Sequence, residues 1–569
     1  MTPNPNNTGG SDEEPMIEPP SPLSPLLADE VPLTGSPSMN NVIIHSSSRR
    51  SSKNSAMLSS EIIHQFILEP TLDEQKSLKL FTLEDDNNSD SSSAKTLPTT
   101  LFPQVLAAIS VSLGSMIIGL ISAYTSSALV SLSNSNYTED STLNITPDGH
   151  EASWIGSLMP LGALVGSIVG GAIVELLGRK TTLLATTLPF IVAWLLISLA
   201  QHIYMLYIAR TIQGICVGVA SLCLPVYLAE TVQPEVRGTL GLLPTTIGNI
   251  GLLICFVAGT FLNWQNLSYL CAVLSLPFLI LMFFIPETPR WYIAHGKDDK
   301  AEQALQWLRG AGTDIRAEFH MIKNTHLESK KHAAKLKDLM GKAYIKPLLT
   351  SLGLMFFQQF SGINAVIFYT VFIFDISGSA LDSNVSTIIV GVVNFGATFM
   401  ANVLIDRLGR KVLLLISDVL MILSLSCLAI FFYMKEHHEH ITVGYGWIPL
   451  GSFMLFVIAF SLGFGPIPWL MLGEIFPGKI RGSAAAASTA FNWICAFVVT
   501  KAFPEFIANF GPYVTFLTFG AICFVGLFFI IFVVPETRGQ SLEDIERNLT
   551  RPFRRLSSTA NLKPSPMFM

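Results

Sequence analysis

The sequence ELLGRK at residues 175–180 returns as DRLGRK at residues 406–411, and each copy follows a long apolar run. Two more pairs repeat in the same order: ETVQPEVRG at 230–238 returns as EIFPGKIRG at 474–482, and PETPRW at 286–291 returns as PETRGQ at 535–540. A single GRK after an apolar run would indicate only a positively charged stop to a membrane span. Three motifs at matching places instead indicate that the chain consists of two related halves.

Apolar residues dominate the chain between these motifs, since 50% of its 569 residues are hydrophobic and 13% are charged. A helix needs ~20 apolar residues to cross a bilayer. Twelve such runs are found, at residues 105–129, 153–177, 181–200, 204–229, 238–261, 267–285, 347–374, 386–405, 412–433, 449–472, 483–508 and 513–534. We therefore expect an all-α polytopic membrane protein with twelve transmembrane helices in two pseudo-symmetric six-helix bundles.

The composition predicts two tails and a linker around these bundles. Residues 1–100 are rich in Ser, Pro, Asn and Asp and poor in aromatic residues, which predicts a disordered tail. The polar linker contains the amphipathic stretch AEQALQWLRG at 301–310, so we expect short helices there. The predicted organisation is a tail at 1–100, a bundle at 101–285, a linker at 286–346, a bundle at 347–534 and a tail at 535–569.

Lysine and arginine residues near the helix ends predict the orientation in the membrane. The loops at 131–152, 262–266 and 375–385 contain neither residue, whereas the linker contains twelve and the tail after Val534 contains six. We therefore expect the linker and both termini to be cytoplasmic. The first outer loop carries two N-glycosylation patterns, which begin at Asn136 and Asn144.

The stretch QQFSGINAVIFYT at 358–370 is unusually polar for a membrane span. On a regular helix one side carries the small and polar residues and two aromatic residues, with Gln359 at the boundary: Gln358, Ser361, Gly362, Asn364, Ala365, Phe368 and Tyr369. Amides in membrane bundles are often hydrogen-bonding glue between helices. We favour a sugar site instead, because an amide both donates and accepts, as a sugar hydroxyl does, without burying a formal charge.

These motifs, together with Arg210 in ARTIQGICVG, resemble the sugar porter branch of the major facilitator superfamily over roughly residues 100–545. Within that branch, SAYTSSALVSL at 122–132 and GTLGLLPTTIGNIGLL at 238–253 are most similar to insect trehalose carriers. The resemblance implies a facilitative sugar transporter that exposes its site to each side of the membrane in turn. It also suggests the plasma membrane, with an endosomal pool if Leu26 and Leu27 act as a sorting signal.

The resemblance carries a set of sugar-binding positions onto this chain. They are Gln358, Gln359 and Asn364 in the polar stretch, and Thr245, Asn394, Phe460, Trp469 and Asn492 elsewhere. We expect Trp469 to stack on an apolar face of the sugar, and Phe368 and Tyr369 to take part in gating. GFGPIPW at 463–469 puts two glycines and two prolines into one span, which predicts a broken helix.

Three positions depart from the pattern that the resemblance implies for glucose carriers. Thr245 and Ser461 stand where a glutamine and a glutamate are common, and Ala496 stands where a second asparagine is common. Every replacement is smaller. We therefore expect a roomier cavity that suits a disaccharide.

The repeated motifs also bring charged residues together at the cytoplasmic ends of the helices. Ion pairs between them can form in one conformation and break in another, so we expect a closable latch between the two halves. The candidate gating residues are Arg179, Glu230, Arg237, Arg410, Glu474 and Arg481.

Proton-coupled relatives carry an aspartate in the first span, whereas residues 113–129 of this chain contain no acid. Gradient-driven flux of trehalose is therefore the expected mechanism. A hexose facilitator and a proton-coupled symporter are the alternatives. A sugar sensor with little transport shares the same motifs and is the alternative of another class.

Nothing in the sequence indicates an enzyme, a cofactor or a nucleic-acid partner. EHHEH at 436–440 is the only conspicuous cluster of metal-ligand residue types, and a solvated loop is the favoured interpretation. All seven cysteines fall inside apolar runs, so we expect packing residues rather than disulfides or metal ligands. The expected partners are a small-molecule sugar and membrane lipid.

Overall fold

The computed structural model describes residues 100–134, 147–331, 341, 344–379, 381–438, 444–476 and 480–538. The chain divides into the units Met1–Ala94 and Lys95–Met569, and every described residue belongs to the second unit. Several sequence predictions lie outside the described residues. These are the two predicted tails except for residues 100 and 535–538, the sorting signal at Leu26 and Leu27, and the glycosylation sites Asn136 and Asn144.

The first half consists of helices that coincide with the predicted apolar runs. They are α3 (Phe102–Asn134), α4 (Gly149–Leu177), α5 (Arg179–Ser198), α6 (Ile203–Thr231), α7 (Pro234–Gly241), α8 (Leu243–Phe261) and α9 (Trp264–Phe284). Local signals set where some of them begin. Asp148 and Glu151 form a capping box at the start of α4, and the Asn263 side chain caps α9.

The second half repeats this pattern with more interruptions. Its helices are α13 (Ile345–Phe360), α14 (Ile363–Phe368), α15 (Thr370–Ser377), α16 (Ser383–Leu408), α17 (Arg410–His437), α19 (Ile448–Leu462), α20 (Ile467–Ile475) and α21 (Arg481–Phe532). Within α21, Gly511 has a φ of 81°, so two membrane-length helices meet there. Among the described residues, eleven helical segments are long and apolar enough to cross a membrane. Splitting the last one at Gly511 accounts for all twelve predicted spans.

The polar stretch 358–370 is not one continuous helix, so the helical-face assignment made from the sequence is wrong. Helix α13 ends at Phe360, and Gly362 adopts a left-handed conformation with a φ of 90° before α14 begins. A side chain at position 362 would also collide with the Phe519 ring, 2.7 Å from the Cβ position. Because the backbone turns at Gly362, residues on either side of it do not share a straight helical face.

The predicted break in the tenth span is present. Helix α19 ends at Leu462 and α20 begins at Ile467, with Gly463, Gly465 and Pro466 in the intervening turn. Its backbone needs hydrogen-bonding partners, because lipid provides none. The Ser417 hydroxyl oxygen accepts from the Phe464 N–H at 3.4 Å and itself donates to the Ala459 carbonyl at 2.7 Å. The break is therefore stabilised from α17.

Small residues let helices approach closely inside the first half. Cβ atoms added at Gly162 and Gly166 of α4, or at Gly214 and Gly218 of α6, would collide with the backbone of the facing helix. Such small-residue contacts replace the hydrophobic driving force that lipid does not supply. The buried Arg210 side chain fixes the same region, because it donates to the carbonyls of Ile121 and Ile155.

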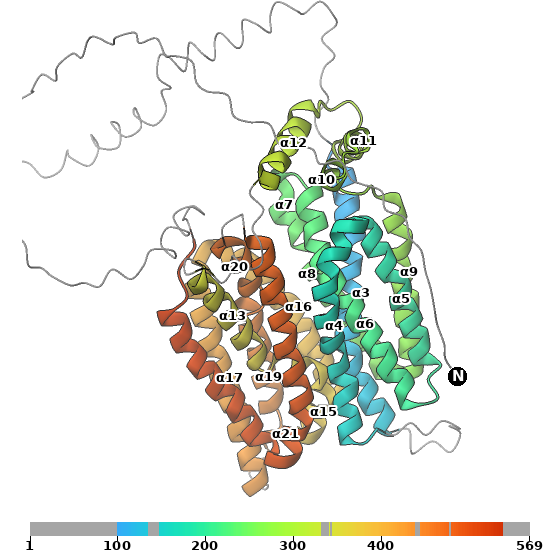
Figure 1. Ribbon diagram of the computed structural model, residues 1–569. Helices are drawn as coiled ribbons and strands as arrows, with labels where there is room; N and C mark the ends of the chain where they lie inside the picture. Colours follow the sequence, from blue (N-terminus) through green and yellow to red (C-terminus); the bar gives the residue numbers. More distant parts are fainter. Residues whose placement is uncertain are drawn as a thin grey trace, which may run out of the picture. The chain divides into compact units, whose positions relative to one another are not determined.

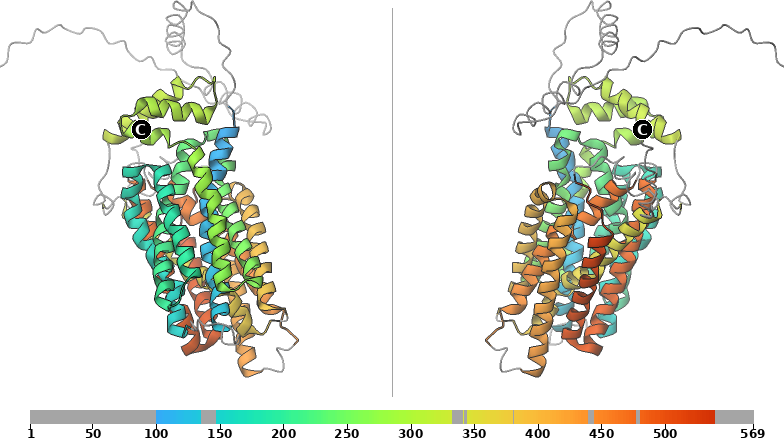
Figure 2. Two further views of the ribbon diagram at one scale, coloured as in Figure 1. Left: turned by 90° about the vertical axis from the view of Figure 1, so that its right-hand side faces the viewer. Right: turned by 90° about the vertical axis from the view of Figure 1, so that its left-hand side faces the viewer.

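Three short helices mark one end of the two bundles, which we call the linker side. They are α10 (Pro289–Ala294), α11 (Asp298–Arg309) and α12 (Arg316–Lys331), and the amphipathic stretch 301–310 lies mainly in α11 as predicted. They share a small apolar core that includes Ile293, Leu305 and Ile322. Both side views in Figure 2 show these helices beyond the same ends of the membrane-length helices. We call the opposite end of the bundles the distal side.

The two halves lie side by side, with α3–α9 forming one group and α13–α21 the other (Figure 1). Helix α4 packs against α21, α8 packs against α16, and α3 contacts both α14 and α15. These contacts form the interface between the halves.

Candidate functional site

Each half has a carboxylate that caps the first helix after its GRK motif. Glu287 accepts from the backbone N–H groups of Arg179 at 2.9 Å, Lys180 at 3.0 Å and Thr181 at 3.2 Å, at the start of α5. In the second half, Glu536 accepts from the N–H groups of Arg410 and Lys411, both at 3.0 Å, at the start of α17. A negative charge at a helix N-terminus also interacts favourably with the helix dipole.

The glycine of each GRK motif makes room for this cap. Gly178 and Gly409 have φ values of 94° and 93°, which favour glycine over residues with a Cβ. A Cβ at position 178 would collide with the Glu287 carboxylate, and one at position 409 would lie 2.9 Å from Glu536 Oε2. The repeated motifs GRK and PET therefore form one structural unit in each half.

The surroundings of Glu536, the less buried of these two carboxylates, set its pKa. Burial raises the pKa of Glu536, but backbone N–H groups of Arg538, Arg410, Lys411 and Thr537 donate to its carboxylate. Together they outweigh the burial, and the pKa of Glu536 lies below its usual value. The ionised carboxylate is thus the form that the fold stabilises.

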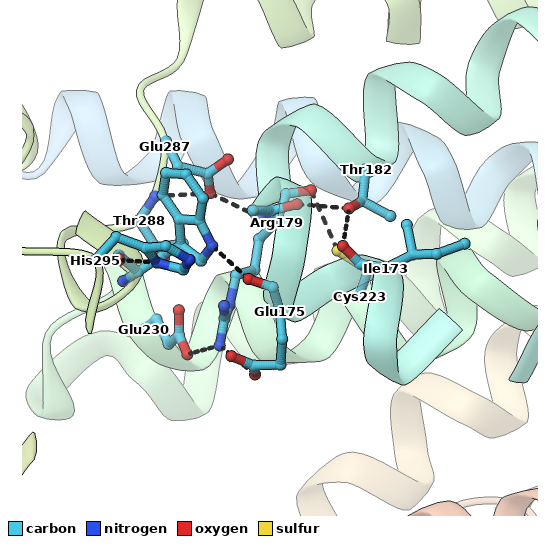
Figure 3. Close-up of polar contacts among 11 residues, drawn as sticks. Ile173, Glu175, Arg179, Thr182, Cys223, Glu230, Glu287, Thr288 and His295 are labelled. Carbon is cyan, nitrogen blue, oxygen red and sulfur yellow. Dashed lines mark hydrogen bonds and ion pairs between the residues drawn. The ribbon is translucent and has the colours of Figure 1, made fainter. Parts of the chain in front are cut away.

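The predicted ion pairs are present on the linker side. Arg179 lies 3.1 Å from Glu230 and 3.0 Å from Glu175, and Figure 3 shows its guanidinium between these two carboxylates. In the second half, Arg410 lies 3.1 Å from Glu474. Each pair joins elements of the same half. No ion pair among the described side chains on this side joins the two halves.

The two remaining candidate gating arginines are Arg237 and Arg481. Arg237 donates from Nη2 to the carbonyl of Val232, 3.2 Å away, at the end of α6. The side chain of Arg481 lies outside the described part of the chain, so its predicted pairing stays a prediction.

A cavity of about 1060 Å³ lies between the halves. This volume is at the upper limit of the ~300–1,000 Å³ typical of ligand pockets. It extends from Gly238 and Ile405, near the linker-side ends of α7 and α16, to Phe256 and Val390, deeper in α8 and α16. None of the described residues that line it is charged.

Four of the predicted sugar-binding residues line this cavity: Thr245, Asn394, Phe460 and Trp469. The Trp469 side chain is 41% exposed, which leaves its ring available to a ligand. Asn394 accepts a hydrogen bond from the Ser461 hydroxyl at 3.0 Å and donates one to Asn249 at 3.4 Å. Asn249 was not selected from the sequence, although it lies four residues after Thr245 on α8.

The other four predicted sugar-binding residues form a hydrogen-bonded amide cluster that does not line the cavity. Asn492 donates to Gln358 at 2.8 Å, Gln359 donates to Asn492 at 3.0 Å, and Asn364 donates to Gln359 at 2.5 Å. Gln358 also donates to the carbonyls of Phe464 and Gly465, in the break between α19 and α20. In this structure the cluster therefore joins α13, α14 and α21 to the break between α19 and α20.

The three departures from the glucose-carrier pattern divide in the same way. Thr245 and Ser461 line the cavity, where a smaller side chain leaves more room. Ala496 is fully buried in α21 and does not line it. Two of the three replacements can thus bear directly on the size of the cavity.

Contacts between the halves close the distal side. The Val371 N–H donates to the Ser126 hydroxyl at 3.0 Å, which joins α15 to α3. The Tyr369 hydroxyl donates to the Thr500 carbonyl at 3.3 Å and lies so close to Gly156 that a Cβ there would collide with it. Phe368, the other aromatic residue predicted to gate, is fully buried.

The ninth span holds an acidic residue that the sequence analysis did not weigh. Asp418 lies in α17 and is fully buried, and neither carboxylate oxygen has a hydrogen-bond partner among the described residues. It does not line the cavity. An acid inside an apolar run was the signal that could have found it.

The described residues contain no group of three or more His, Cys, Asp or Glu side chains placed to hold a metal ion. The predicted EHHEH stretch begins in α17 and its last two residues lie outside the described part of the chain. All seven cysteines are free thiols, and all except Cys427 are buried, as expected of packing residues.

Two six-helix bundles with matching polar caps, around a cavity at their interface, define a transporter of the major facilitator fold. The family model described as "Sugar (and other) transporter" matches residues 107–549. The chain belongs to this family of sugar transporters, whose members are not enzymes.

Several relatives are similar over most of this chain. The facilitated trehalose transporter Tret1 of Anopheles gambiae is 59% identical over 471 residues, which are 82% of this chain and 59% of that protein. The Tret1 protein of Culex quinquefasciatus is 59% identical over 465 residues, which are 81% of this chain and 89% of the relative. The chain therefore spans less than two thirds of the mosquito relative from Anopheles but most of the one from Culex.

Solved structures of a bacterial transporter share the fold. The inward open conformation of the xylose transporter XylE from E. coli has a TM-score of 0.65 and 25% identity, over 79% of this chain and 100% of that one. The proton:xylose symporter XylE bound to 6-bromo-6-deoxy-D-glucose has a TM-score of 0.64 and 27% identity, over 79% of this chain and 99% of that one.

Proposed function

We propose that this protein is a facilitative transporter that moves trehalose down its concentration gradient by alternating access. The observation that carries the proposal is the uncharged cavity between the halves, lined by Asn394, Thr245 and the Trp469 indole. A neutral polar solute fits such a lining, because amides and hydroxyls satisfy its hydroxyl groups without a counterion. The similarity to insect transporters named for trehalose supports the choice of sugar.

Within the cavity, Trp469 stacks on an apolar face of the sugar, and Asn394 and Thr245 hydrogen-bond its hydroxyls. The Phe460 ring forms an apolar part of the cavity wall. The buried amide cluster of Gln358, Gln359, Asn364 and Asn492 takes part when its members exchange hydrogen bonds with one another for hydrogen bonds with the sugar. Such an exchange is feasible because each amide keeps both donor and acceptor groups.

Alternating access requires gates on both sides of the cavity. On the distal side, the gate consists of the contacts made by Tyr369 and Phe368. On the linker side, the latch consists of Arg179 with Glu230 and Arg410 with Glu474, and of the arginines Arg237 and Arg481. Each of these ion pairs lies within one half in this structure. The pairs therefore have to rearrange if they are to hold the two halves together when the cavity closes on the linker side.

The linker side faces the cytoplasm in this proposal, because the linker and the tail after Val534 carry the excess of lysine and arginine. Both termini are then cytoplasmic, and Asn136 and Asn144 face the outside. The plasma membrane is the proposed location, with an endosomal pool directed by Leu26 and Leu27. Partners are the sugar and the surrounding lipid.

Uptake of labelled trehalose and labelled glucose by cells that lack sugar carriers tests this function. We expect saturable trehalose uptake that falls at least tenfold in Trp469→Ala. Trp447→Ala is the matched control, because Trp447 precedes α19, is 64% exposed and does not line the cavity. Glucose uptake alone would favour a hexose facilitator, and sugar binding without uptake would favour a sensor.

A further inference from the structure

Asn249 is the only amide that the described part of the first half contributes to the cavity lining. It lies on α8, four residues after Thr245, so both side chains are on one face of that helix. On α16 in the second half, Asn394 and Thr398 are also four residues apart and also line the cavity. Two pairs of polar side chains, one from each half, therefore meet in the cavity.

Direct hydrogen bonds join these two pairs. Asn249 donates from Nδ2 to the Thr398 hydroxyl at 2.8 Å, and its Oδ1 accepts from Asn394 Nδ2 at 3.4 Å. The second distance lies beyond the usual 2.7–3.2 Å range for N–H···O bonds, so this bond is weak. Asn249 uses one of its two N–H donors and one of its two acceptor positions in these contacts. It retains one donor and one acceptor for a ligand.

The position of Asn249 also matches the shape of a sugar. Farther along α8, the cavity lining continues with Leu252 and Phe256, which are apolar. A sugar presents hydroxyl groups at its edge and C–H groups on its ring faces. A polar residue followed by apolar ones on a single helical face can contact both kinds of surface.

We propose that Asn249 is a sugar-binding residue, and that a sugar hydroxyl replaces Asn394 at its amide oxygen. This inference rests on the proposed function. The bound sugar then bonds Asn249 in the first half and Asn394 in the second half at once, so it takes over a contact that joins the halves when the cavity is empty. Asn249 thereby selects for solutes that are long enough, and hydroxylated enough, to reach both halves.

The test compares Asn249→Leu, which keeps the approximate shape of the side chain but cannot hydrogen-bond, with the control Asn509→Leu. Asn509 is an exposed residue of α21 that does not line the cavity. Trehalose uptake by purified protein in liposomes gives KM and maximal rate, and quenching of tryptophan fluorescence by trehalose gives Kd. We expect KM and Kd to rise about 5- to 10-fold in Asn249→Leu, as the loss of one or two neutral hydrogen bonds predicts. The maximal rate should stay within about twofold of the wild type, because the contact with the sugar is lost equally from the bound state and from the transition state.

The outcomes separate this inference from the proposed function. If the wild type transports trehalose and Asn249→Leu has an unchanged KM and Kd, Asn249 does not bind the sugar and the inference is wrong. A wild type that moves neither trehalose nor glucose overturns the proposed function and this inference with it. If Asn249→Leu does not fold, Asn249→Ala, which also lacks a hydrogen-bonding side chain, replaces it, and an unchanged KM in that variant overturns the inference equally.

Discussion

Lys501 of α21 donates a hydrogen bond from Nζ to the Ser153 hydroxyl of α4 at 2.6 Å. The same ammonium group lies 4.8 Å from the centroid of the Trp154 ring, in a cation–π contact, and 2.8 Å from Glu505. These contacts join the two halves on the distal side. They add to the contact of the Tyr369 hydroxyl with Gly156 of α4, while the cavity extends toward the linker side.

Lys501→Met should therefore weaken the closure of the distal side. A cation–π contact at an exposed site contributes ~0.5–1 kcal/mol, and a hydrogen bond from a charged group adds ~1.5–3 kcal/mol. Water forms replacement contacts that recover part of this free energy, so we expect the population of molecules that are open on the distal side to rise about tenfold. Double electron–electron resonance measures this population through the distances between spin labels placed at the distal ends of α4 and α21. Lys300→Met, an exposed residue of α11, is the control, and an equal distance distribution in both variants would refute the closure by Lys501.

Glu230→Gln should destabilise the protein far more than Glu175→Gln, although both residues contact Arg179. The Glu230 side chain is 12% exposed and that of Glu175 is 67% exposed. Removing the buried partner leaves the Arg179 charge with only the exposed Glu175 carboxylate beside it, at a cost of ~3 kcal/mol, whereas removing the exposed partner costs less than ~1 kcal/mol. Thermal unfolding of the two variants in detergent measures the difference. Equal midpoints would mean that Glu230 and Glu175 are equivalent partners of Arg179.

Acidification should destabilise the second half through Glu536. Because the pKa of Glu536 is lower in the folded protein than in an unfolded chain, its contribution to stability is complete above about pH 4.5. That contribution disappears as the pH falls through the lower folded-state pKa. The melting temperature of the wild type should thus fall between pH 5 and pH 3 (approximate limits set by the reference pKa) more steeply than that of Glu536→Gln. Parallel melting curves across that range would show that this carboxylate is not the group responsible.

Asp418→Leu should stabilise the protein without changing sugar uptake. A buried carboxyl group without hydrogen-bond partners destabilises the fold, and its removal recovers ~1–3 kcal/mol. The exposed Asp375 of α15 provides the control variant Asp375→Leu, for which little change is expected. A higher melting temperature with unchanged trehalose uptake is the predicted pair of results. Loss of uptake in Asp418→Leu would instead indicate that this acid takes part in transport, as in a proton-coupled carrier.

The membrane spans could be predicted from the sequence because an apolar run of about 20 residues in lipid has few alternatives to a helix. The broken tenth span could be predicted for a related reason, since two glycines and two prolines lie within seven residues. The turn at Gly362 could not, because one glycine in an apolar run does not reveal a positive φ. That turn separates Gln358 from Asn364 and makes the helical-face assignment fail.

The candidate site was only partly predictable, because burial depends on packing between distant segments. Thr245 and Trp469 line the cavity, whereas Gln358 and Asn492, chosen by the same resemblance, hydrogen-bond each other outside it. The capping of α5 by Glu287 was missed, since nothing local in PETPRW indicates a helix that begins 108 residues earlier.

The equilibrium distribution of trehalose across the membrane of liposomes that contain the purified protein tests the central claim most directly. A facilitative transporter must bring the internal concentration up to the external concentration and no further, with or without an imposed pH gradient. We predict the same plateau in both conditions, and slow filling in Trp469→Ala. Accumulation above the external concentration when the pH gradient is present would contradict the account and identify a proton-coupled symporter.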